Sequence, residues 1–402
     1  MTSAGRASAV LSAGQTTGSA TVGVTVDHQT VTNSATIMLP QMSVDHASLQ
    51  FAATTLSTAF TSVTSPQIVH LVQSGAGPVT WAAVSNQPWL VVSPTSGSGS
   101  ASLNVSVQFV PGLASSQAGT ITLTFTGAGN SAGPVGVTLN TIAAPAAPFR
   151  SFDTPADGST GLSGSIAVTG WALDDVQVTS VGICRDAVAP EVMVPDSRCA
   201  NQPKIFIGNA VFIDGARPDV QAQFPKYPLS SRGGWGYLML TNFLPNLGTG
   251  TYNLYAYAND SDGHTTLLGW KTISCANSTS TTPFGAIDTP GQGETVSGSG
   301  YANFGWVLSA APSFADPPDG GTVSVFIDGA SVGTPVGWAA RSDLTSLFPA
   351  AQFPGINKAL GVYGLDTTAF ANGLHTIAWI VTNNTGTTAG VGSRFITIAT
   401  GR

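Results

Sequence analysis

Three pairs of aspartates are the residues whose type and spacing could best support hydrolysis or cation binding. They are Asp174 with Asp175, Asp260 with Asp262, and Asp316 with Asp319. A hydrolase needs convergent carboxylates, or a nucleophile paired with a base. Each pair lies in a turn-like context with no histidine or further acid at motif spacing, and no G-x-S-x-G nucleophile motif occurs. We therefore expect a protein that is not an enzyme and that carries no cofactor.

Residues 259–264 read Asn-Asp-Ser-Asp-Gly-His. The carboxylates of Asp260 and Asp262 beside Gly263 offer the hard oxygen ligands that calcium prefers. An EF-hand loop also needs a later bidentate glutamate, which this segment lacks. A β-turn that uses aspartate and glycine for positive φ is the simpler interpretation. Metal binding by Asp260 and Asp262 stays open as the alternative.

Aromatic residues gather between positions 224 and 270, where they could form a carbohydrate-binding surface. Sugars stack their C–H faces on exposed rings, while neighbouring Asn or Asp side chains bind the hydroxyls. A core role is the simpler interpretation, because Tyr255 and Tyr257 alternate in phase and share one strand face. The candidates for a glycan surface are Trp235, Tyr237, Trp270 and Trp338.

Cys184 and Cys199 flank a polar loop and are the candidates for a disulfide. The bridge would contribute about 3 kcal/mol in the chain-entropy model. The chain has three cysteines, so a bridge from Cys275 to either of the others stays open. No C-x-x-C motif or histidine-rich cluster accompanies them, which makes a zinc site a poor interpretation.

The composition excludes several classes of protein. Only 8% of the residues are charged, and 13 Lys and Arg face 20 Asp and Glu, for a formal net charge of −7. No basic stripe is present to neutralise phosphates, so nucleic acid is not an expected partner. No run of about 18 apolar residues occurs, so we expect no membrane insertion. Surfaces rich in Ser, Thr, Gly and Asn favour an extracellular or cell-surface location.

Apolar and polar residues alternate along almost every apolar stretch, which is the period of β-strands. Residues 102–109 read Ser-Leu-Asn-Val-Ser-Val-Gln-Phe, for example, and residues 322–327 read Thr-Val-Ser-Val-Phe-Ile. Asp-Gly and Asn-Gly turns separate these stretches, and helical periodicity is confined to short turns near 219–224 and 343–348. The pattern predicts an all-β protein built of tandem immunoglobulin-like β-sandwiches.

An internal repeat links residues 149–275 with residues 283–400. Phe152-Asp-Thr-Pro155 and Gly170-Trp171 recur, with equal spacing, as Ile287-Asp-Thr-Pro290 and Gly305-Trp306. The first copy is longer between its tryptophan and an Asp-Gly-Ala turn. The loop between the first two cysteines accounts for that insertion.

The repeat also preserves an arginine and an aspartate after the Asp-Gly-Ala turn. These residues are Arg217 with Asp219 and Arg341 with Asp343. An Arg–carboxylate pair at this spacing would pin the loop that follows the turn, so we expect a structural latch rather than a binding site. Trp171 and Trp306 occupy equivalent positions, and we expect both in cores.

Residues 88–97 read Pro-Trp-Leu-Val-Val-Ser-Pro-Thr-Ser-Gly, and further motif residues are Leu49-Gln-Phe51, Val79-Thr-Trp81, Leu103-Asn-Val-Ser-Val107 and Gly119-Thr-Ile-Thr122. On these residues the segment 47–141 resembles a BACON domain, an immunoglobulin-like β-sandwich of bacterial secreted proteins. The resemblance implies a module linked to carbohydrate-active enzymes, acting as a glycan binder or as a spacer. Residues 149–275 and 283–400 resemble bacterial immunoglobulin-like modules, which implies no established activity.

Stretches rich in Pro, Ala, Ser and Thr at 143–148 and 276–283 mark the expected boundaries. Residues 1–42 are expected to form a partial β domain or an N-terminal hairpin, and 43–145 a BACON-like sandwich. Residues 149–275 are expected to form an immunoglobulin-like module with the disulfide-loop insertion, and 283–400 its second copy.

The expected function is that of a non-catalytic spacer or adhesion region in a bacterial secreted or surface protein. Exposed sheet edges favour self-association, with the N-terminal unit as the natural edge. The alternative is a set of carbohydrate-binding modules attached to a carbohydrate-active enzyme, with glycans or surface polymers as partners.

Overall fold

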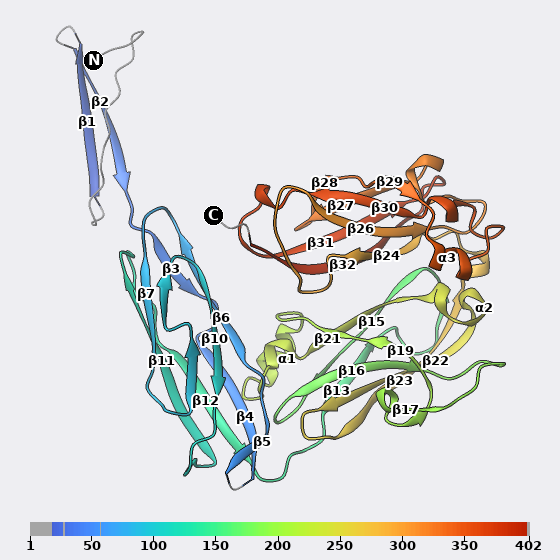
Figure 1. The fold of residues 1–402 in the computed structure, drawn as a ribbon, viewed down its shortest axis with the longest axis horizontal. Coiled ribbons are helices and arrows are strands. Elements are labelled where there is room, and N and C mark those ends of the chain that lie inside the picture. Colours follow the sequence, from blue (N-terminus) through green and yellow to red (C-terminus); the bar gives the residue numbers. More distant parts are fainter. Residues whose placement is uncertain (1–17, 27–28, 57, 400–402) are drawn as a thin grey trace.

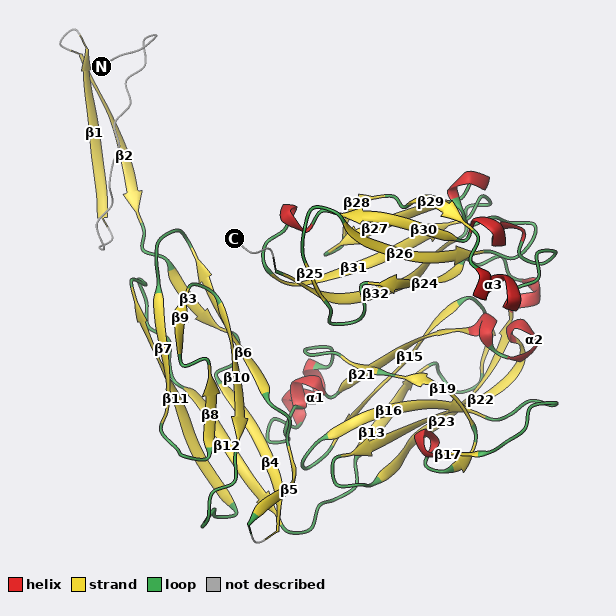
Figure 2. Ribbon diagram, in the orientation of Figure 1, coloured by secondary structure: helices red, strands yellow, loops and turns green. Residues whose placement is uncertain are grey.

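The computed structural model describes residues 18–26, 29–56 and 58–399, and its regular elements are mostly strands (Figure 1, Figure 2). The first two strands, β1 (Gly18–Val26) and β2 (Gln29–Ile37), form a two-stranded antiparallel sheet. The rest of the chain forms three immunoglobulin-like sandwiches of two sheets each. We name them, in chain order, the first, second and third sandwich.

The first sandwich combines a four-stranded sheet of order β3-β6-β10-β8 with a six-stranded sheet of order β5-β4-β12-β11-β7-β9. All its ladders are antiparallel except the one between β4 and β12. The strands are β3 (Gln41–Val44), β4 (Ser48–Leu56), β5 (Ala59–Val63), β6 (Gln67–Ser74), β7 (Thr80–Ser85), β8 (Leu90–Ser93), β9 (Ser96–Ser98), β10 (Ala101–Val107), β11 (Ser116–Thr126) and β12 (Val135–Ile142).

The second sandwich combines sheets of order β13-β15-β21-β20 and β14-β23-β22-β16-β19. The strands are β13 (Phe149–Thr154), β14 (Ser159–Leu162), β15 (Ser165–Leu173), β16 (Val178–Arg185), β19 (Ile205–Asn209), β20 (Val211–Phe212), β21 (Gly234–Leu240), β22 (Thr249–Asp260) and β23 (Thr265–Ala276). The insertion between β16 and β19 adds a separate small sheet of β17 (Pro195–Asp196) and β18 (Gln202–Pro203).

The third sandwich repeats this strand order in full, as β24-β26-β30-β29 and β25-β32-β31-β27-β28. The strands are β24 (Phe284–Thr289), β25 (Thr295–Val296), β26 (Tyr301–Leu308), β27 (Thr322–Ile327), β28 (Ala330–Gly333), β29 (Val336–Ala339), β30 (Leu360–Leu365), β31 (Gly373–Thr382) and β32 (Thr388–Ile398). The sequence repeat is therefore a repeat of folded structure, and the insertion leaves the two sheets unchanged.

The helices are short and lie in the connections (Figure 2). The α-helices are α1 (Pro218–Gln223), α2 (Pro245–Gly248) and α3 (Ser342–Leu347), and the 3₁₀ turns are η1 (Ser197–Cys199), η2 (Ser230–Arg232), η3 (Thr241–Phe243), η4 (Asn277–Thr279), η5 (Pro317–Asp319), η6 (Pro354–Lys358) and η7 (Thr367–Ala369). None of the helices in the described ranges has the length and hydropathy needed to cross a bilayer.

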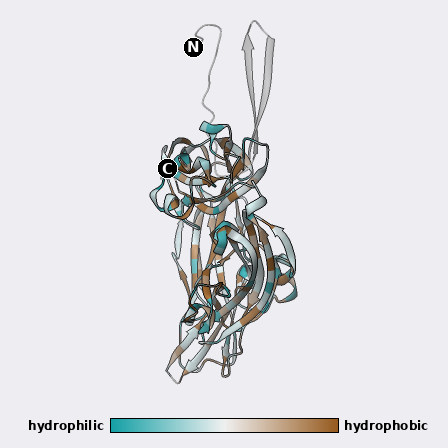
Figure 3. Cartoon of the chain, turned by 90° about the vertical axis from the view of Figure 1, so that its right-hand side faces the viewer, coloured by the Kyte–Doolittle hydropathy of each residue, from teal (hydrophilic) through white to brown (hydrophobic). Residues whose placement is uncertain are grey.

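The strands bury every second side chain between the two sheets. In β10, Leu103 and Val105 are buried while Asn104 between them is exposed, and Figure 3 shows apolar and polar residues alternating along the strands. The core of the first sandwich contains Phe51 and Trp89, both almost fully buried. Period-two burial therefore accounts for the sandwich architecture.

The glycine of each Gly-Trp motif makes room for a tryptophan from another strand. In the second sandwich, a Cβ atom on Gly170 would collide with the Trp235 ring and with the carbonyl oxygen of Ser151. In the third, a Cβ atom on Gly305 would lie 3.2 Å from the Trp379 ring. Trp235 is 3% exposed and Trp379 is 0% exposed. The same backbone position thus accommodates the largest core side chain in both copies.

The motif tryptophans themselves lie outside the cores between the sheets. Trp306 packs edge-on against Phe284 and close to Phe348, the residue that follows α3, and this cluster is buried. Trp171 packs against Phe149 and Phe224 but is only half-buried. The expected core position is therefore confirmed for Trp306, in a smaller cluster beside α3, whereas Trp171 is only half-buried.

The predicted Arg–Asp latch is present in both copies. Arg217 forms two hydrogen bonds with Asp219, of 2.9 and 2.7 Å, and Arg341 binds Asp343 in the same way. Each arginine also holds an aspartate of the repeated Asp-Thr-Pro motif, Asp153 in one copy and Asp288 in the other. The sequence pattern did not identify this second aspartate as a partner of the arginine. It ties the loop after the Asp-Gly-Ala turn to the first strand of its sandwich.

Gly170→Ala should destabilise the second sandwich by about 2 kcal/mol or more, because the new methyl group has to displace Trp235 or the backbone of Ser151. The matched control is Gly236→Ala in β21, where the nearest atom to a Cβ lies 3.7 Å away. Thermal unfolding of the two variants measures the difference. Equal melting temperatures would show that the glycine is not required by packing.

Candidate functional site

The structure does not bring the four candidate glycan-binding residues together. Trp235 is buried in the core and cannot stack on a sugar, which corrects that part of the prediction. Tyr237 is half-buried against the same core. Trp338 belongs to the third sandwich, where its indole N–H donates to the Pro335 carbonyl at 3.2 Å. Of these four candidates, only Trp270 presents a largely exposed ring, at 54% exposure.

Trp270 lies on β23 opposite Tyr255 of β22, where the ladder makes the two residues cross-strand neighbours. The ammonium group of Lys204 lies 3.7 Å from the centre of the Tyr255 ring, and the Tyr255 hydroxyl donates to Asp186 at 3.1 Å. Asp186 also accepts from Asn253 at 2.9 Å. One exposed ring with polar neighbours is therefore what remains of the predicted carbohydrate surface.

The predicted disulfide between Cys184 and Cys199 is present and anchors the insertion over the outer face of β16 and β22. The tip of the insertion, residues 192–194, exposes two valines and a methionine. Cys275 is a buried free cysteine, and burial raises the pKa of its thiol to about 11.

The contact between the first and second sandwiches brings other polar residues together. The β4–β5 edge of the first sandwich meets the loop 174–177 and the β22–β23 turn 260–264 of the second. The contacts are hydrogen bonds from Thr64 Oγ1 to Val176 O (2.9 Å), from the Ser65 N–H to Gln177 Oε1 (2.7 Å), from Ser62 Oγ to Ser261 Oγ (2.7 Å) and from Thr54 Oγ1 to Asp262 Oδ1 (3.3 Å). We name this region the first junction.

Three carboxylates converge at the first junction. One oxygen from each of Asp174, Asp175 and Asp262 lies within 4.8 Å of the others. Asp174 is 2% exposed, and the other two are half-buried. Sequence analysis treated the pair at 174–175 and the pair at 260–262 as separate turns. They meet because β16 and β22 are paired with Val178 opposite Asp260, a register that neither segment specifies on its own.

Asp260, one of the two predicted metal ligands, does not belong to this group. Its Oδ1 accepts the backbone N–H groups of Asp262 and His264, at 2.9 and 2.8 Å, and its Oδ2 lies 2.8 Å from the His264 ring. The carboxylate therefore closes its own turn, as the simpler interpretation expected. Asp262 keeps the position of a possible ligand.

Burial is the largest influence on the pKa of two of these carboxylates, Asp174 and Asp262. It raises the pKa of Asp174 to about 6, and the nearby charges of Asp175 and Asp260 add to the rise. Burial likewise raises the pKa of Asp262, against the hydrogen bonds that this carboxylate accepts. Carboxylates at this junction are thus costly to hold ionised unless positive charge reaches them.

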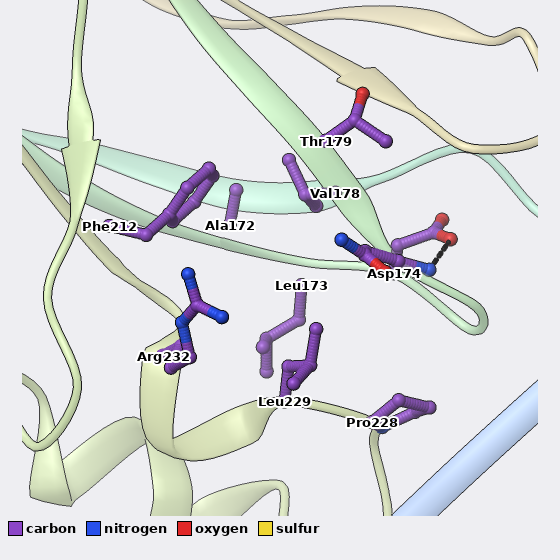
Figure 4. Close-up of a pocket in the computed structure, with 10 residues that line it drawn as sticks. Ala172, Leu173, Asp174, Val178, Thr179, Phe212, Pro228, Leu229 and Arg232 are labelled. Atoms are coloured by element: carbon purple, nitrogen blue, oxygen red, sulfur yellow. Dashed lines mark hydrogen bonds between the residues drawn. The ribbon is translucent and has the colours of Figure 1, made fainter. Parts of the chain in front are cut away.

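A small pocket of about 70 Å³ adjoins Asp174 (Figure 4). Figure 4 shows Phe212, Leu229 and Arg232 around it, with Asp174 at one side. Ligand pockets for drug-sized molecules usually measure about 300–1,000 Å³. The space suits water or an ion rather than a sugar ring.

Asp316 in the third sandwich is a second buried acid, 1% exposed, and neither of its carboxylate oxygens has a hydrogen-bond partner. Burial raises its pKa to about 6, and the neighbouring carboxylate of Asp319 contributes. Asp319 is bound by the Lys358 ammonium group at 2.7 Å. The pair lies in no cleft that would admit a substrate among the described residues, because Asp316 is enclosed.

Comparison with protein families matches residues 41–140 to the viral BACON domain. This segment coincides with the first sandwich, and the BACON resemblance expected from residues 47–141 is thereby confirmed. The comparison with curated proteins found no match.

Solved structures with similar strand arrangements include the fibronectin(III)-like modules of Clostridium thermocellum CbhA, at 14% identity over 63% of this chain and 95% of that chain, with a TM-score of 0.19. A Bacteroides ovatus xyloglucanase in complex with a heptasaccharide shows 17% identity over 31% of this chain and 21% of its own, with a TM-score of 0.18. PorU from Porphyromonas gingivalis shows 9% identity over 90% and 34%, with a TM-score of 0.34. Likenesses this distant carry no argument about function.

Asp316→Asn should change how stability depends on pH. A folded-state pKa of about 6, raised from 3.8, means that stability is full below pH 4 and is lost as the pH rises through 6. The variant removes this loss, so its melting temperature relative to the wild type should rise between about pH 4 and pH 7.5.

Asp366→Asn provides a control of opposite sign, because hydrogen bonds from Thr368 lower the pKa of Asp366. Its melting temperature relative to the wild type should fall as the pH rises toward about 4 and should then stay level up to pH 7.5, because a lowered pKa makes the stabilisation by the Asp366 carboxylate complete above the unfolded value of 3.8. Thermal unfolding at several pH values measures both. Parallel profiles for Asp316→Asn and the wild type would contradict the assignment.

Proposed function

We propose that this chain is a non-catalytic spacer of an extracellular or surface-exposed assembly, in which three sandwiches in series hold their neighbours at a fixed separation. The observation that carries the proposal is the direct closure of both contacts between sandwiches. At the first junction, Thr64 is 2% exposed and donates across the contact to the second sandwich. A freely jointed linker would leave such groups in solvent.

The contact between the second and third sandwiches, which we name the second junction, is closed by hydrogen bonds to the linker and by ring contacts between the sandwiches. Asn383 and Ser309 both donate to the Thr281 carbonyl, at 2.8 and 2.5 Å. Phe243 of the second sandwich packs edge-on against Trp306 and Phe348 of the third, with ring centres 6.0 and 5.2 Å apart. Apolar and polar contacts together resist bending at this point.

Low charge and a surface of small polar residues support an extracellular setting. The family model that matches residues 41–140 describes a viral domain. The proposal therefore covers the surface of a virion as well as the surface of a bacterium. The edges of the β1–β2 sheet would allow copies to associate by strand pairing.

Carbohydrate binding is the second candidate, and the exposed ring of Trp270 favours it. The site would comprise this ring, the polar end of Tyr255 and the Asp186 carboxylate on the face covered in part by the insertion. It would add adhesion to the spacer role.

Phe243→Ser should loosen the second junction without unfolding either sandwich, because it removes two ring contacts between the modules. Small-angle X-ray scattering of the full chain should then show a larger radius of gyration and a broader distance distribution. Leu374→Ser, at a side chain 68% exposed, is the control and should leave the curve unchanged. Identical curves for all three proteins would refute a rigid second junction.

Trp270→Ala should abolish retention on a glycan array and quenching of tryptophan fluorescence by the bound glycan, if the second candidate is correct. Trp338→Ala, which alters a ring held by its own hydrogen bond in the third sandwich, is the matched control. An array without hits for the wild type would remove the candidate.

A further inference from the structure

We propose that Asp174, Asp175 and Asp262 form a binding site for a calcium ion at the first junction. The three residues come from two loops of the second sandwich, and one oxygen of each lies within 4.8 Å of the others. Calcium binds carboxylate oxygens at about 2.3–2.6 Å. Two oxygens on one ion therefore lie at most about twice that distance apart, and the 4.8 Å limit met by these three residues agrees with this. The site is separate from the aromatic surface and does not depend on any glycan-binding role.

Each of the three carboxylates has one oxygen engaged by the protein. Asp174 Oδ2 accepts the N–H groups of Val176 and Gln177, both at 2.9 Å, and Figure 4 shows one of these bonds. Asp175 Oδ2 accepts the N–H of Ala146 in the linker at 2.9 Å. Asp262 Oδ1 accepts the Thr54 hydroxyl of the first sandwich at 3.3 Å. These bonds fix the orientation of the carboxylates, as the supports of metal ligands do.

The other oxygen of each carboxylate is buried without a partner. These atoms are Asp174 Oδ1, Asp175 Oδ1 and Asp262 Oδ2. Asp174 is itself 2% exposed, so water does not solvate its second oxygen from outside. A buried carboxylate oxygen without a donor is strongly unfavourable. Three such oxygens, on residues whose carboxylates converge, indicate a missing positive partner.

No side chain supplies that partner within the described ranges, where none of the three acids forms an ion pair with Lys, Arg or His. His264, two residues after Asp262 in the chain, is held by Asp260 at 2.8 Å. No basic side chain of the described residues therefore compensates the charge that these carboxylates carry when ionised. Their hard oxygen atoms favour calcium or magnesium over a transition metal.

The second junction shows what the same position looks like without acids. Since Trp171 aligns with Trp306 and Asp260 with Asn383, the equivalents of the three acids are Ser309, Ala310 and Thr385. There, Ser309 donates directly to the linker carbonyl of Thr281, and the Thr385 hydroxyl donates to Asn383 at 2.9 Å. Neutral side chains close this contact by themselves. At the first junction the hydrogen bonds between the sandwiches leave one oxygen of each acid unpaired, and a cation would satisfy these oxygens.

Calcium is the better assignment than magnesium because the site is irregular and combines carboxylates from a loop and a turn of the second sandwich. Calcium tolerates such geometry, whereas magnesium demands near-ideal octahedral coordination and keeps several waters. Three carboxylates without a dedicated loop suggest a dissociation constant of roughly 10⁻⁴ M, in the range of extracellular modules. Bound calcium would link the loop whose Asp175 accepts from Ala146 of the linker to the turn that contacts Thr54.

Isothermal titration calorimetry of the full chain, after treatment with a chelator, tests the site with calcium chloride and magnesium chloride as separate titrants. We expect saturable binding of one calcium ion per chain and weaker binding of magnesium. Asp175→Asn and Asp262→Asn should each weaken calcium binding about tenfold or more. Circular dichroism confirms that each variant is folded.

Asp316→Asn is the matched control, because Asp316 is also a buried acid with unpartnered oxygens but lies in the third sandwich. It should bind calcium like the wild type. Absence of saturable calcium binding up to about 10 mM would overturn the proposal. So would unchanged affinity in both junction variants, or tighter binding of magnesium than of calcium.

Scattering with and without calcium then tests whether the ion braces the first junction, a step that rests on the proposed spacer function. The distance distribution should narrow on saturation for the wild type and not for Asp262→Asn. An unchanged distance distribution of the wild type on addition of calcium would overturn the bracing role. The calorimetric titration would still decide whether the three acids bind calcium. The Phe243 experiment concerns the other junction, so the two can fail separately.

Discussion

Polar groups that become buried where two sandwiches meet must find partners, and this constraint shapes both junctions. A β-turn or strand end normally exposes its side chains to water. Once a neighbouring sandwich covers it, each unpaired donor or acceptor costs about 1–3 kcal/mol. At the second junction, Asn383 and Ser309 satisfy the linker carbonyl of Thr281. At the first junction, Thr64 and Gln177 form hydrogen bonds between the two sandwiches. One oxygen of each neighbouring carboxylate still lacks a hydrogen-bond partner.

The two repeated sandwiches show how one framework accommodates different interiors. Both place a glycine directly before the motif tryptophan, in β15 and in β26, and both fill the space above this glycine with an indole ring. The ring comes from β21 in one copy and from β31 in the other, on opposite sheets. In the third sandwich the Trp379 N–H donates to the buried side chain of Asn303 at 2.8 Å, whereas the Trp235 N–H has no partner. Strand order thus constrains the fold more tightly than the identity of any core residue.

Much of the architecture could be predicted from the sequence, because alternation and turn residues act locally. The strands, the repeat, the disulfide loop and the Arg217–Asp219 latch all follow from residues close together in the chain. The acidic group at the first junction could not be predicted in this way. It depends on the pairing of β16 with β22 and on the seating of Thr54 against the turn, which are contacts between distant segments. The sequence also suggested a glycan-binding role for Trp235, which lies between two glycines. The same local sequence is compatible with a buried and with an exposed tryptophan, and only contacts with distant segments decide between them.

The unpaired cysteine of the second sandwich bears on how the protein matures under oxidising conditions. Thiol–disulfide exchange requires a thiolate, and burial raises the pKa of the Cys275 thiol to about 11, which keeps it protonated at neutral pH. The sulfur is also enclosed, at 4% exposure. Once the sandwich has folded, Cys275 cannot attack the bridge between Cys184 and Cys199, and it is equally shielded from forming a covalent dimer. An odd number of cysteines is therefore compatible with a single, stable redox form.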